Sequence, residues 1–178
     1  MAPRLDSGSR ELLLIIDARD AKTTVSNFKL NDGSYVEDLQ VRLEVLSEQE
    51  KRRYLSSQQF AELWNSSGSF QNRIIEKNAS TDFFRVYRRV EYPNSWEVFT
   101  VSPDSASLPT DLFSFWIGHC LTSHSTVTQS GMITLCRSYV VIGDVAANFT
   151  ISSQNLANTD SIRGYLANLV TEWEKGAR

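Results

Sequence analysis

The sequence predicts an α+β fold made of a single domain. We expect a strongly curved, mostly antiparallel sheet, or a partly open barrel, of about eight strands with two or three helices. Two observations support this prediction: residues 131–153 alternate like a β-hairpin, and residues 160–173 form an amphipathic C-terminal helix. The predicted order of elements, βββ-α-βββ-α-ββ-α, also lacks the helices between strands that a parallel sheet requires.

Gly143 and Asp144 separate the two apolar halves of the hairpin, and a two-residue connection that begins with glycine is typical of a type II′ turn. This turn pairs Ile142 with Val145, so one face of the hairpin is apolar. That face carries Cys136, Val140 and Ile142 on one strand and Val145, Ala147, Phe149 and Ile151 on the other. The apolar stripe of the helix comprises Ile162, Tyr165, Leu166, Leu169, Val170 and Trp173. We expect the helix to plug one end of the sheet or to cross its concave face.

The N-terminal part predicts three strands after a short tail. Residues 1–9 are expected to be a mobile tail, and residues 10–178 form the predicted domain. The first strand spans residues 10–18, and its continuous apolar centre is typical of a strand buried on both faces. Residues 22–30, rich in Thr, Val and Phe, predict a second strand. Residues 39–45, in which apolar and polar side chains alternate, predict a third.

A helix and three more strands follow. The Ser-x-x-Glu capping box at Ser47 predicts a helix, with a second helical segment over residues 58–64. Strands are predicted at residues 70–77, 82–90 and 96–102. The last two are expected to form a hairpin around a proline-containing turn, because proline cannot sit in a central strand.

Composition limits the classes of function. The chain has 178 residues, 41% of them hydrophobic and 11% aromatic, which suits one globular domain and excludes a disordered chain. Its formal net charge of −3 gives no global attraction to nucleic acid or to anionic membranes. No apolar run approaches the ~20 residues of a transmembrane segment, and no signal peptide is recognisable. With only two cysteines, the chain is predicted to be intracellular and cytoplasmic, in a reducing compartment.

Every histidine and cysteine lies in one short window: His119, Cys120, His124 and Cys136. Two imidazoles and two thiols match the ligand set of a structural zinc site, although this spacing matches no familiar zinc module. The alternative is that both cysteines are buried as free thiols, because free cysteine packs as a small hydrophobe. A disulfide between them is geometrically open but is not expected in a reducing compartment.

A second helix is predicted after Thr110, and it would turn His119 about 100° away from Cys120. The predicted apolar face of this helix consists of Leu112, Phe113, Trp116, Ile117, Cys120 and Leu121. A serine or cysteine nucleophile could use only His119 or His124 as its base. We therefore do not expect a catalytic pair in this segment.

One predicted strand interleaves aromatic residues with arginines, and Phe83, Arg85, Tyr87 and Arg89 share one of its faces. Bases could stack on the two aromatic rings while the arginines meet phosphates, as on sheets that bind single-stranded nucleic acid. The alternative is a solvated sheet face on which nearby glutamates, Glu91 and Glu97, pair with the arginines.

Two segments resemble known families. Residues 13–17, followed by a Thr-rich stretch and Asp32, resemble the first hairpin of the ribonuclease H and actin-like ATPase folds, in which the strand-end aspartate holds Mg²⁺ or faces a phosphate. Arg19 departs from this pattern, where the ATPases have a glycine, and the parallel strands of those folds are not predicted. Residues 149–151, before a helix that contains Trp173, resemble the end of pleckstrin-homology-like domains, which implies a binding function.

No established catalytic motif occurs in the sequence. The leading hypothesis is a non-catalytic interaction protein that binds a protein partner through a sheet face or edge, without a cofactor, and homo-oligomerisation is also open. The second is a carrier of a small apolar ligand, or an enzyme, with a barrel or helix-grip cavity. The third is an RNA-binding or viral-type structural protein that uses the strand 83–89 as a local basic patch. The cavity of the second hypothesis would be lined by Phe70, Phe84, Trp96, Phe99, Phe149 and Tyr165.

Overall fold

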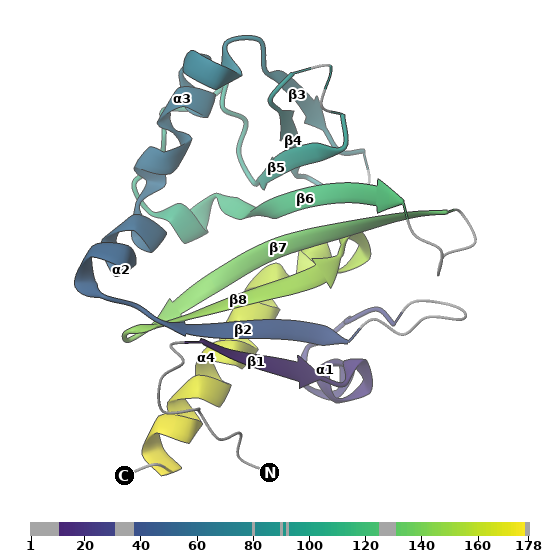
Figure 1. Ribbon diagram of the computed structural model, residues 1–178. Coiled ribbons are helices and arrows are strands. Elements are labelled where there is room, and N and C mark those ends of the chain that lie inside the picture. The colour runs from purple at the N-terminus through teal and green to yellow at the C-terminus, as the bar shows by residue number, and fades with distance from the viewer. Residues whose placement is uncertain are drawn as a thin grey trace.

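The computed structural model describes residues 11–30, 38–79, 81–89, 91, 93–124 and 131–176. The predicted tail and Asp32 lie outside these residues. The described strands form a single open, eight-stranded antiparallel sheet in the order β1-β2-β8-β7-β6-β5-β4-β3 (Figure 1). The predicted α+β class, the antiparallel sheet and the C-terminal helix are therefore confirmed. None of the described helices is long and apolar enough to cross a membrane.

The strands are β1 (Glu11–Ile16), β2 (Leu39–Val45), β3 (Ile74–Lys77), β4 (Phe84–Tyr87), β5 (Ser95–Phe99), β6 (Trp116–His124), β7 (Met132–Ile142) and β8 (Val145–Ser152). The α-helices are α1 (Ala18–Thr24), α2 (Glu48–Leu55), α3 (Ala61–Trp64) and α4 (Thr159–Gly176). Short 3₁₀ turns occupy Ser57–Phe60, Gly68–Phe70, Leu112–Ser114 and Ser153–Asn158.

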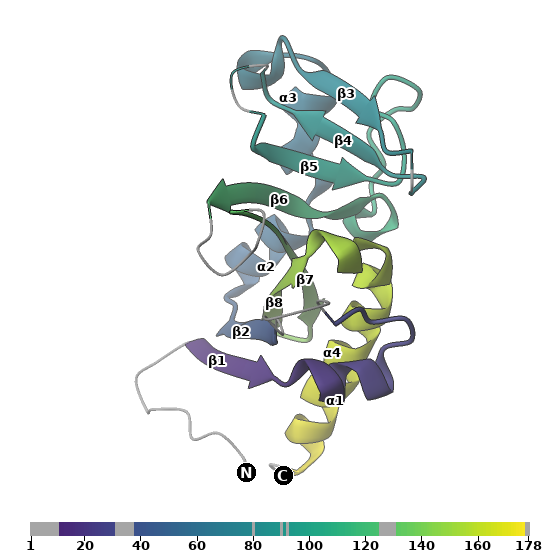
Figure 2. The same ribbon diagram turned by 90° about the vertical axis from the view of Figure 1, so that its right-hand side faces the viewer.

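Helices cover the two faces of the sheet in different halves. On one face, which we call the α4 face, α1 and α4 pack against β2, β8 and β7 (Figures 1 and 2). On the opposite face, α3 and the turn before it cover the half that contains β5. The core of the α4 face includes Ala21, Val41, Phe149, Ile162 and Leu166. The core of the other half includes Phe60, Trp64, Val86, Phe99, Phe115 and Trp116. The face turned away from α4 is covered less: α2 packs against Tyr139 of β7, while Leu13, Gln40 and Arg137 are exposed. We call this face the open face, and it runs from β1 across β2, β8, β7 and β6 to the first residues of β5.

The predicted C-terminal hairpin and helix are confirmed, except that Trp173, which was predicted to lie on the core-facing stripe of the helix, is 37% exposed. Ile142 pairs with Val145 across the turn, and Cys136 pairs with Ile151 further along β7 and β8. Gly143 has a φ of 56°, a left-handed conformation that glycine adopts without the steric cost of a side chain. The helix α4 passes behind β7 and β8 in the view of Figure 1.

The capping box and the central hairpin are also confirmed. The Ser47 side chain accepts a hydrogen bond from the backbone N–H of Glu50, and the Glu50 side chain accepts one from the Ser47 backbone N–H. This reciprocal pair starts α2. The strands β4 and β5 pair antiparallel, as predicted for the segments on either side of the proline-containing turn.

The predicted strand at residues 22–30 is wrong, because α1 begins directly after β1. The Asp17 carboxylate accepts a 2.7 Å hydrogen bond from the Arg19 backbone N–H and caps the helix. Ala18 and Ala21 are completely buried against the core of the α4 face, so packing outweighs the strand preference of the Thr and Val residues that follow. The resemblance to a ribonuclease H hairpin therefore does not extend past β1.

The predicted helix after Thr110 is also wrong. A single 3₁₀ turn leads into β6, which pairs with both β5 and β7. Trp116 and Ile117 face different cores and are both buried, so this part of the strand is continuously apolar. A continuous apolar run fits a buried strand and a buried helix equally well, and the helical spacing that predicted a helix here was coincidental.

The strand β1 was predicted to be buried on both faces, but it lies at the edge of the sheet. Leu14 and Ile16 pack against the core of the α4 face. Leu13 and Ile15 point to the open face and are 63% and 65% exposed. A strand whose sequence is typical of complete burial is therefore exposed to solvent on one of its two faces.

Candidate functional site

A row of polar side chains crosses the open face, and the pairing of the strands determines it. We call this row the polar floor. His119 on β6 lies opposite Arg137 on β7, Arg137 lies opposite Thr150 on β8, and Thr150 lies opposite Gln40 on β2. Residues directly opposite one another in a sheet point to the same side. The row continues to Glu97 on β5 beyond His119. Five strands distant in sequence thus place polar and charged side chains in one line.

A pocket of about 410 Å³ lies over this floor. Arg42, His119 and Arg137 contribute cationic or titratable groups, while Leu13 and Tyr139 contribute apolar walls. Arg42 is 3.8 Å from Glu11 in an exposed ion pair. The pocket is thus lined by cationic, polar and apolar groups together, which suits an amphipathic or anionic ligand group rather than a purely apolar one.

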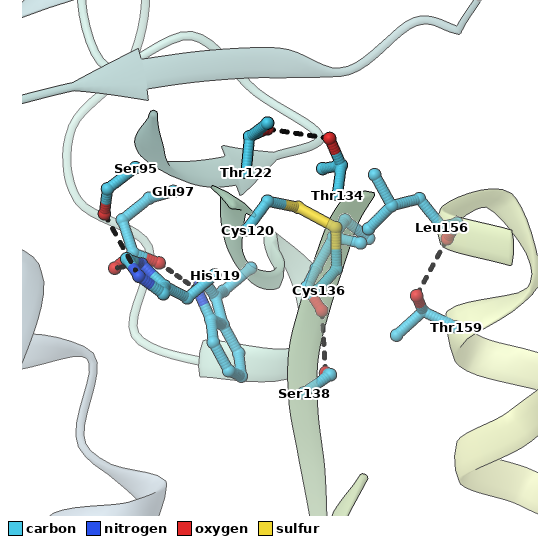
Figure 3. Close-up of a disulfide and its surroundings, with 12 residues drawn as sticks. Ser95, Glu97, His119, Cys120, Thr122, Thr134, Cys136, Ser138, Leu156 and Thr159 are labelled. Carbon is cyan, nitrogen blue, oxygen red and sulfur yellow. Dashed lines mark hydrogen bonds and ion pairs between the residues drawn. A yellow bond between two sulfur atoms is a disulfide. The ribbon is translucent and has the colours of Figure 1, made fainter. Parts of the chain in front are cut away.

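Ser95, His119 and Glu97 form a hydrogen-bonded chain at the β5–β6 end of the open face (Figure 3). The Ser95 hydroxyl lies 3.2 Å from Nε2 of His119, and Nδ1 of the same ring lies 2.9 Å from Oε1 of Glu97. The other carboxylate oxygen accepts a 2.9 Å hydrogen bond from the Trp116 indole N–H. The carboxylate is therefore held in place from two sides.

The environment of His119 favours its protonated form. The hydrogen bond to Glu97 raises the pKa of His119 above its ordinary value, while partial burial and the nearby charge of Arg137 act in the opposite direction. The side chain of His119 is 42% exposed, and that of Glu97 is 20% exposed. The imidazole is therefore both oriented and accessible from solvent.

The side chain of Tyr139 lies between Trp116, which binds Glu97, and Tyr54 of α2. Its hydroxyl donates a 2.7 Å hydrogen bond to the backbone carbonyl oxygen of Tyr54 and accepts a hydrogen bond from Gln59. Its ring lies 4.9 Å from the Trp116 ring, measured between centroids. Burial raises the pKa of Tyr139, so its hydroxyl stays protonated and acts as a structural donor.

Sequence reasoning missed the Ser95–His119–Glu97 arrangement because it assigned His119 to a helix. In a strand, residues two apart share a face, so Ser95 and Glu97 on β5 point the same way. The signal that could have revealed the site is therefore a Ser-x-Glu pair on one predicted strand, with a histidine on its neighbour. Without the β5–β6 register, nothing in the sequence places these residues together.

The structure separates the four residues predicted as zinc ligands. Cys120 and Cys136 lie directly opposite one another on β6 and β7, with their Cα atoms 4.0 Å apart, and they form a disulfide on the α4 face (Figure 3). His119 points to the open face, and His124 lies exposed at the end of β6. Among the described residues, no group of three or more His, Cys, Asp or Glu is close enough to hold a metal ion.

The expectation of free buried thiols is half correct. Cys120 and Cys136 are 0% and 1% exposed, as expected for buried cysteines, but no free cysteine remains. Because residues 112–121 were predicted as a helix, the two cysteines were not expected on paired strands. Direct cross-strand pairing places their side chains within bonding distance.

The predicted arginine–aromatic surface exists in part. It lies on the same side of the sheet as α4, but over β4 and β5 rather than next to the helix. The Arg85 guanidinium lies 5.4 Å from the centroid of the Trp96 ring, which is 5.5 Å from the Tyr87 ring. Phe83 packs against the same core, and Arg89 is exposed beyond the end of β4. RNA binding by this surface stays a prediction.

Two expectations linked to that strand need correction. Glu97 was expected to pair with the arginines, but it points to the other face and binds His119 and Trp116. The aromatic residues expected to line one cavity also divide between the two cores. Trp96, Phe149 and Tyr165 belong to the core of the α4 face, whereas Phe70 and Phe99 belong to the other.

A scan against known protein families found no match, and neither a search of curated proteins nor a search of solved structures found a significant one. No relative assigns a function to this chain. Its own surface chemistry is what supports a function.

Proposed function

We propose that the chain is an interaction protein that binds an extended segment of a partner protein by adding it as a strand to β1. The observation that supports this proposal is that the edge strand β1 is apolar and exposed to solvent on one face. The strand β1 has the sequence Glu-Leu-Leu-Leu-Ile-Ile, and its Leu13 and Ile15 are about two-thirds exposed on the open face.

Edge strands of natural sheets are normally protected against pairing by charges, proline, a bulge or short length. Within β1, residues 12–16 contain no charge, no proline and no glycine, and all six residues of the strand pair with β2 without a register shift. The opposite edge, β3, is only four residues long and ends with Glu76 and Lys77. Among the described residues, the β3 edge thus carries such protection, whereas residues 12–16 of β1 do not.

The surroundings of β1 describe the segment that would fit. An added strand would extend the row of Leu13 and Ile15, so its side chains on that face should be apolar. Arg42 lies directly opposite Leu13 on β2 and borders the polar pocket. An acidic side chain flanking the apolar core of the segment would compete with Glu11 for this arginine. The proposed partner therefore presents alternating apolar residues followed or preceded by a carboxylate.

A peptide-display selection with the purified protein tests this proposal and supplies the probe. We expect selected peptides to be extended, to alternate, and to lose about tenfold or more in affinity for the Ile15→Lys variant. Leu55→Lys is the matched control, because Leu55 lies at the end of α2, outside the sheet, and is 43% exposed. Fluorescence anisotropy of a labelled selected peptide measures the affinities.

Backbone chemistry distinguishes strand addition from simple adhesion to leucine side chains. In a paired strand only alternate N–H groups point at the neighbour. N-methylation of one alternating set in the selected peptide should abolish binding, and methylation of the other set should not. Equal tolerance of both sets, or no selectable peptide, would overturn the proposal. A dimer that Ile15→Lys dissociates in sedimentation velocity would replace the partner segment with a second copy of this chain.

The compartment is a separate proposal. The sequence predicts an intracellular, cytoplasmic protein, but the Cys120–Cys136 disulfide argues against it, because structural disulfides are rare in reducing compartments. Alkylation of thiols in intact expressing cells, followed by mass spectrometry, distinguishes a reducing from an oxidising compartment. Alkylated cysteines indicate a reducing compartment, and unmodified, linked cysteines indicate an oxidising one.

A further inference from the structure

We propose that Ser95, His119 and Glu97 form a nucleophile–base–carboxylate triad that hydrolyses carboxylic esters at the open face. This activity goes beyond the proposed binding function and departs from the non-catalytic role that the sequence predicts. It does not depend on the identity of any partner segment at β1.

The atoms are connected in the order that nucleophilic catalysis requires. In a serine triad the hydroxyl meets Nε2 of the histidine, and the carboxylate meets Nδ1. Here the Ser95 Oγ–Nε2 distance is 3.2 Å and the Nδ1–Glu97 Oε1 distance is 2.9 Å. Once the imidazole is neutral, the Glu97 hydrogen bond selects the tautomer in which Nδ1 carries the proton and Nε2 is free to accept one. The Trp116 N–H fixes the second carboxylate oxygen at 2.9 Å.

All three side chains come from rigid elements rather than from loops. Ser95 and Glu97 are two residues apart on β5, and His119 is directly opposite Glu97 on β6. Sites built on paired strands hold their geometry more tightly than sites on loops. Ser95 is partly exposed, and His119 lines the 410 Å³ pocket, so a substrate can reach the pair from solvent.

The reaction would proceed in two displacements. Ser95 Oγ attacks the ester carbonyl carbon while its proton passes to His119 Nε2; the bond to the alkoxy oxygen breaks, and that oxygen takes the proton and leaves as an alcohol. Water then attacks the acyl-serine, giving a proton to Nε2. The acyl–Oγ bond breaks, Oγ recovers the proton, and a carboxylic acid leaves. One ester and one water thus become one alcohol and one acid.

Neighbouring residues indicate the class of ester. Leu121 lies directly opposite Ser95 and is 48% exposed, and its own partner on β7 is Leu135. These two side chains offer an apolar surface for a short acyl chain. Arg137 lies directly opposite His119 on the same face, so its guanidinium is a candidate to stabilise a developing oxyanion. The substrate class is therefore short-chain esters with an apolar acyl group.

The experiment uses a fluorophosphonate probe and 4-nitrophenyl butyrate with the full chain. We expect the probe to label Ser95, located by peptide mass spectrometry, and we expect Ser95→Ala to abolish both labelling and butyrate hydrolysis. His119→Gln should lower kcat/KM at least ~100-fold, the usual range for loss of a general base. The matched controls, Ser123→Ala and His124→Gln, change an exposed serine and the other histidine and should leave the rate unchanged.

The pH profile tests Glu97 as a positioning residue. Hydrolysis should rise with pH as His119 loses its proton. Glu97→Gln should lower the rate and move the midpoint of this rise to lower pH, which a purely structural role would not do. Each variant is checked for an unchanged circular dichroism spectrum.

Absence of labelling at Ser95 in the folded protein would overturn the proposal. Hydrolysis that persists in Ser95→Ala but disappears in His119→Gln would also overturn it, because the imidazole alone would then be the nucleophile.

Discussion

Arg163 on α4 donates a 3.1 Å hydrogen bond from Nε to the backbone carbonyl oxygen of Tyr139 on β7. The same guanidinium donates from Nη2 to the carbonyl oxygen of Trp116 at 3.0 Å and to the Ser138 hydroxyl at 3.0 Å. It also lies 4.9 Å from the centroid of the Phe113 ring. Burial lowers the pKa of Arg163, and the carboxylate of Asp160 opposes that effect. One buried arginine thus fixes α4 to β6 and β7.

We expect Arg163→Met to lower the free energy of unfolding by about 3 kcal/mol, because it leaves buried carbonyl oxygens without donors. The side chain of Arg163 is 7% exposed, so water cannot replace these hydrogen bonds. Asp160→Asn is the control. Asp160 pairs with Arg163 but is 75% exposed, and its loss should change stability by less than about 1 kcal/mol. Urea denaturation followed by tryptophan fluorescence measures both, and equal losses would contradict this account.

The disulfide between β6 and β7 should stabilise the fold by restricting the unfolded chain. Its two cysteines are 16 positions apart in the sequence, for which loop-closure entropy predicts about 3 kcal/mol. A phosphine reductant should therefore lower the urea midpoint of the wild type. The double variant Cys120→Ala/Cys136→Ala should not respond to the reductant. Two free thiols in the unreduced, denatured wild type would show that the disulfide had not formed.

The sequence predicted those parts of the fold whose pattern is local. The register of β7 and β8 follows from the turn at Gly143 and from alternation along both strands. The capping box at Ser47 and the stripe of α4 are likewise determined by residues close in sequence. The errors concern segments whose conformation depends on distant partners: β6 is a strand because β5 and β7 flank it, and α1 is a helix because Ala18 and Ala21 fit against the core.

The same distinction explains which sites were predicted. Phe83, Arg85 and Tyr87 share a face as expected, because alternation within one strand decides it. The contact of His119 with Ser95 and Glu97 depends on the register between β5 and β6, including the irregularity between Val98 and Phe99. No pattern within a single segment encodes that register.

Gly118 marks a close approach between β6 and β7. A Cβ atom at this position would lie 2.6 Å from the backbone carbonyl oxygen of Arg137, which cannot move aside as a side chain can. We expect Gly118→Ala to lower the free energy of unfolding by about 1–3 kcal/mol. Gly164→Ala is the matched control, because nothing lies within 4 Å of its added Cβ on α4. That variant should gain up to about 1 kcal/mol of stability from helix propensity. If urea denaturation gave both variants a change in the free energy of unfolding of the same sign, the close approach of β6 and β7 at Gly118 would be contradicted.

Stability should also depend on the protonation of His119. The hydrogen bond to Glu97 raises the pKa of His119 in the folded protein above the ordinary value of 6.5. Above pH 6.5 the folded state then binds more protons than the unfolded state, so this contribution is complete below pH 6.5 and is lost as the pH rises through the folded pKa. Glu97→Gln should lower the midpoint of the His119 imidazole resonances in an NMR titration.

The difference in free energy of unfolding between wild type and His119→Gln isolates this effect from other titrating groups. We expect the difference to favour the wild type most at about pH 6 and to shrink towards about pH 9. His124→Gln is the control, since His124 has no carboxylate partner among the ion pairs of the described residues. Its difference from the wild type should not follow the same course. If the stability curves of the wild type and His119→Gln run parallel across this range, the His119–Glu97 contact contributes nothing to folding, and its geometry must then be maintained by the strands alone.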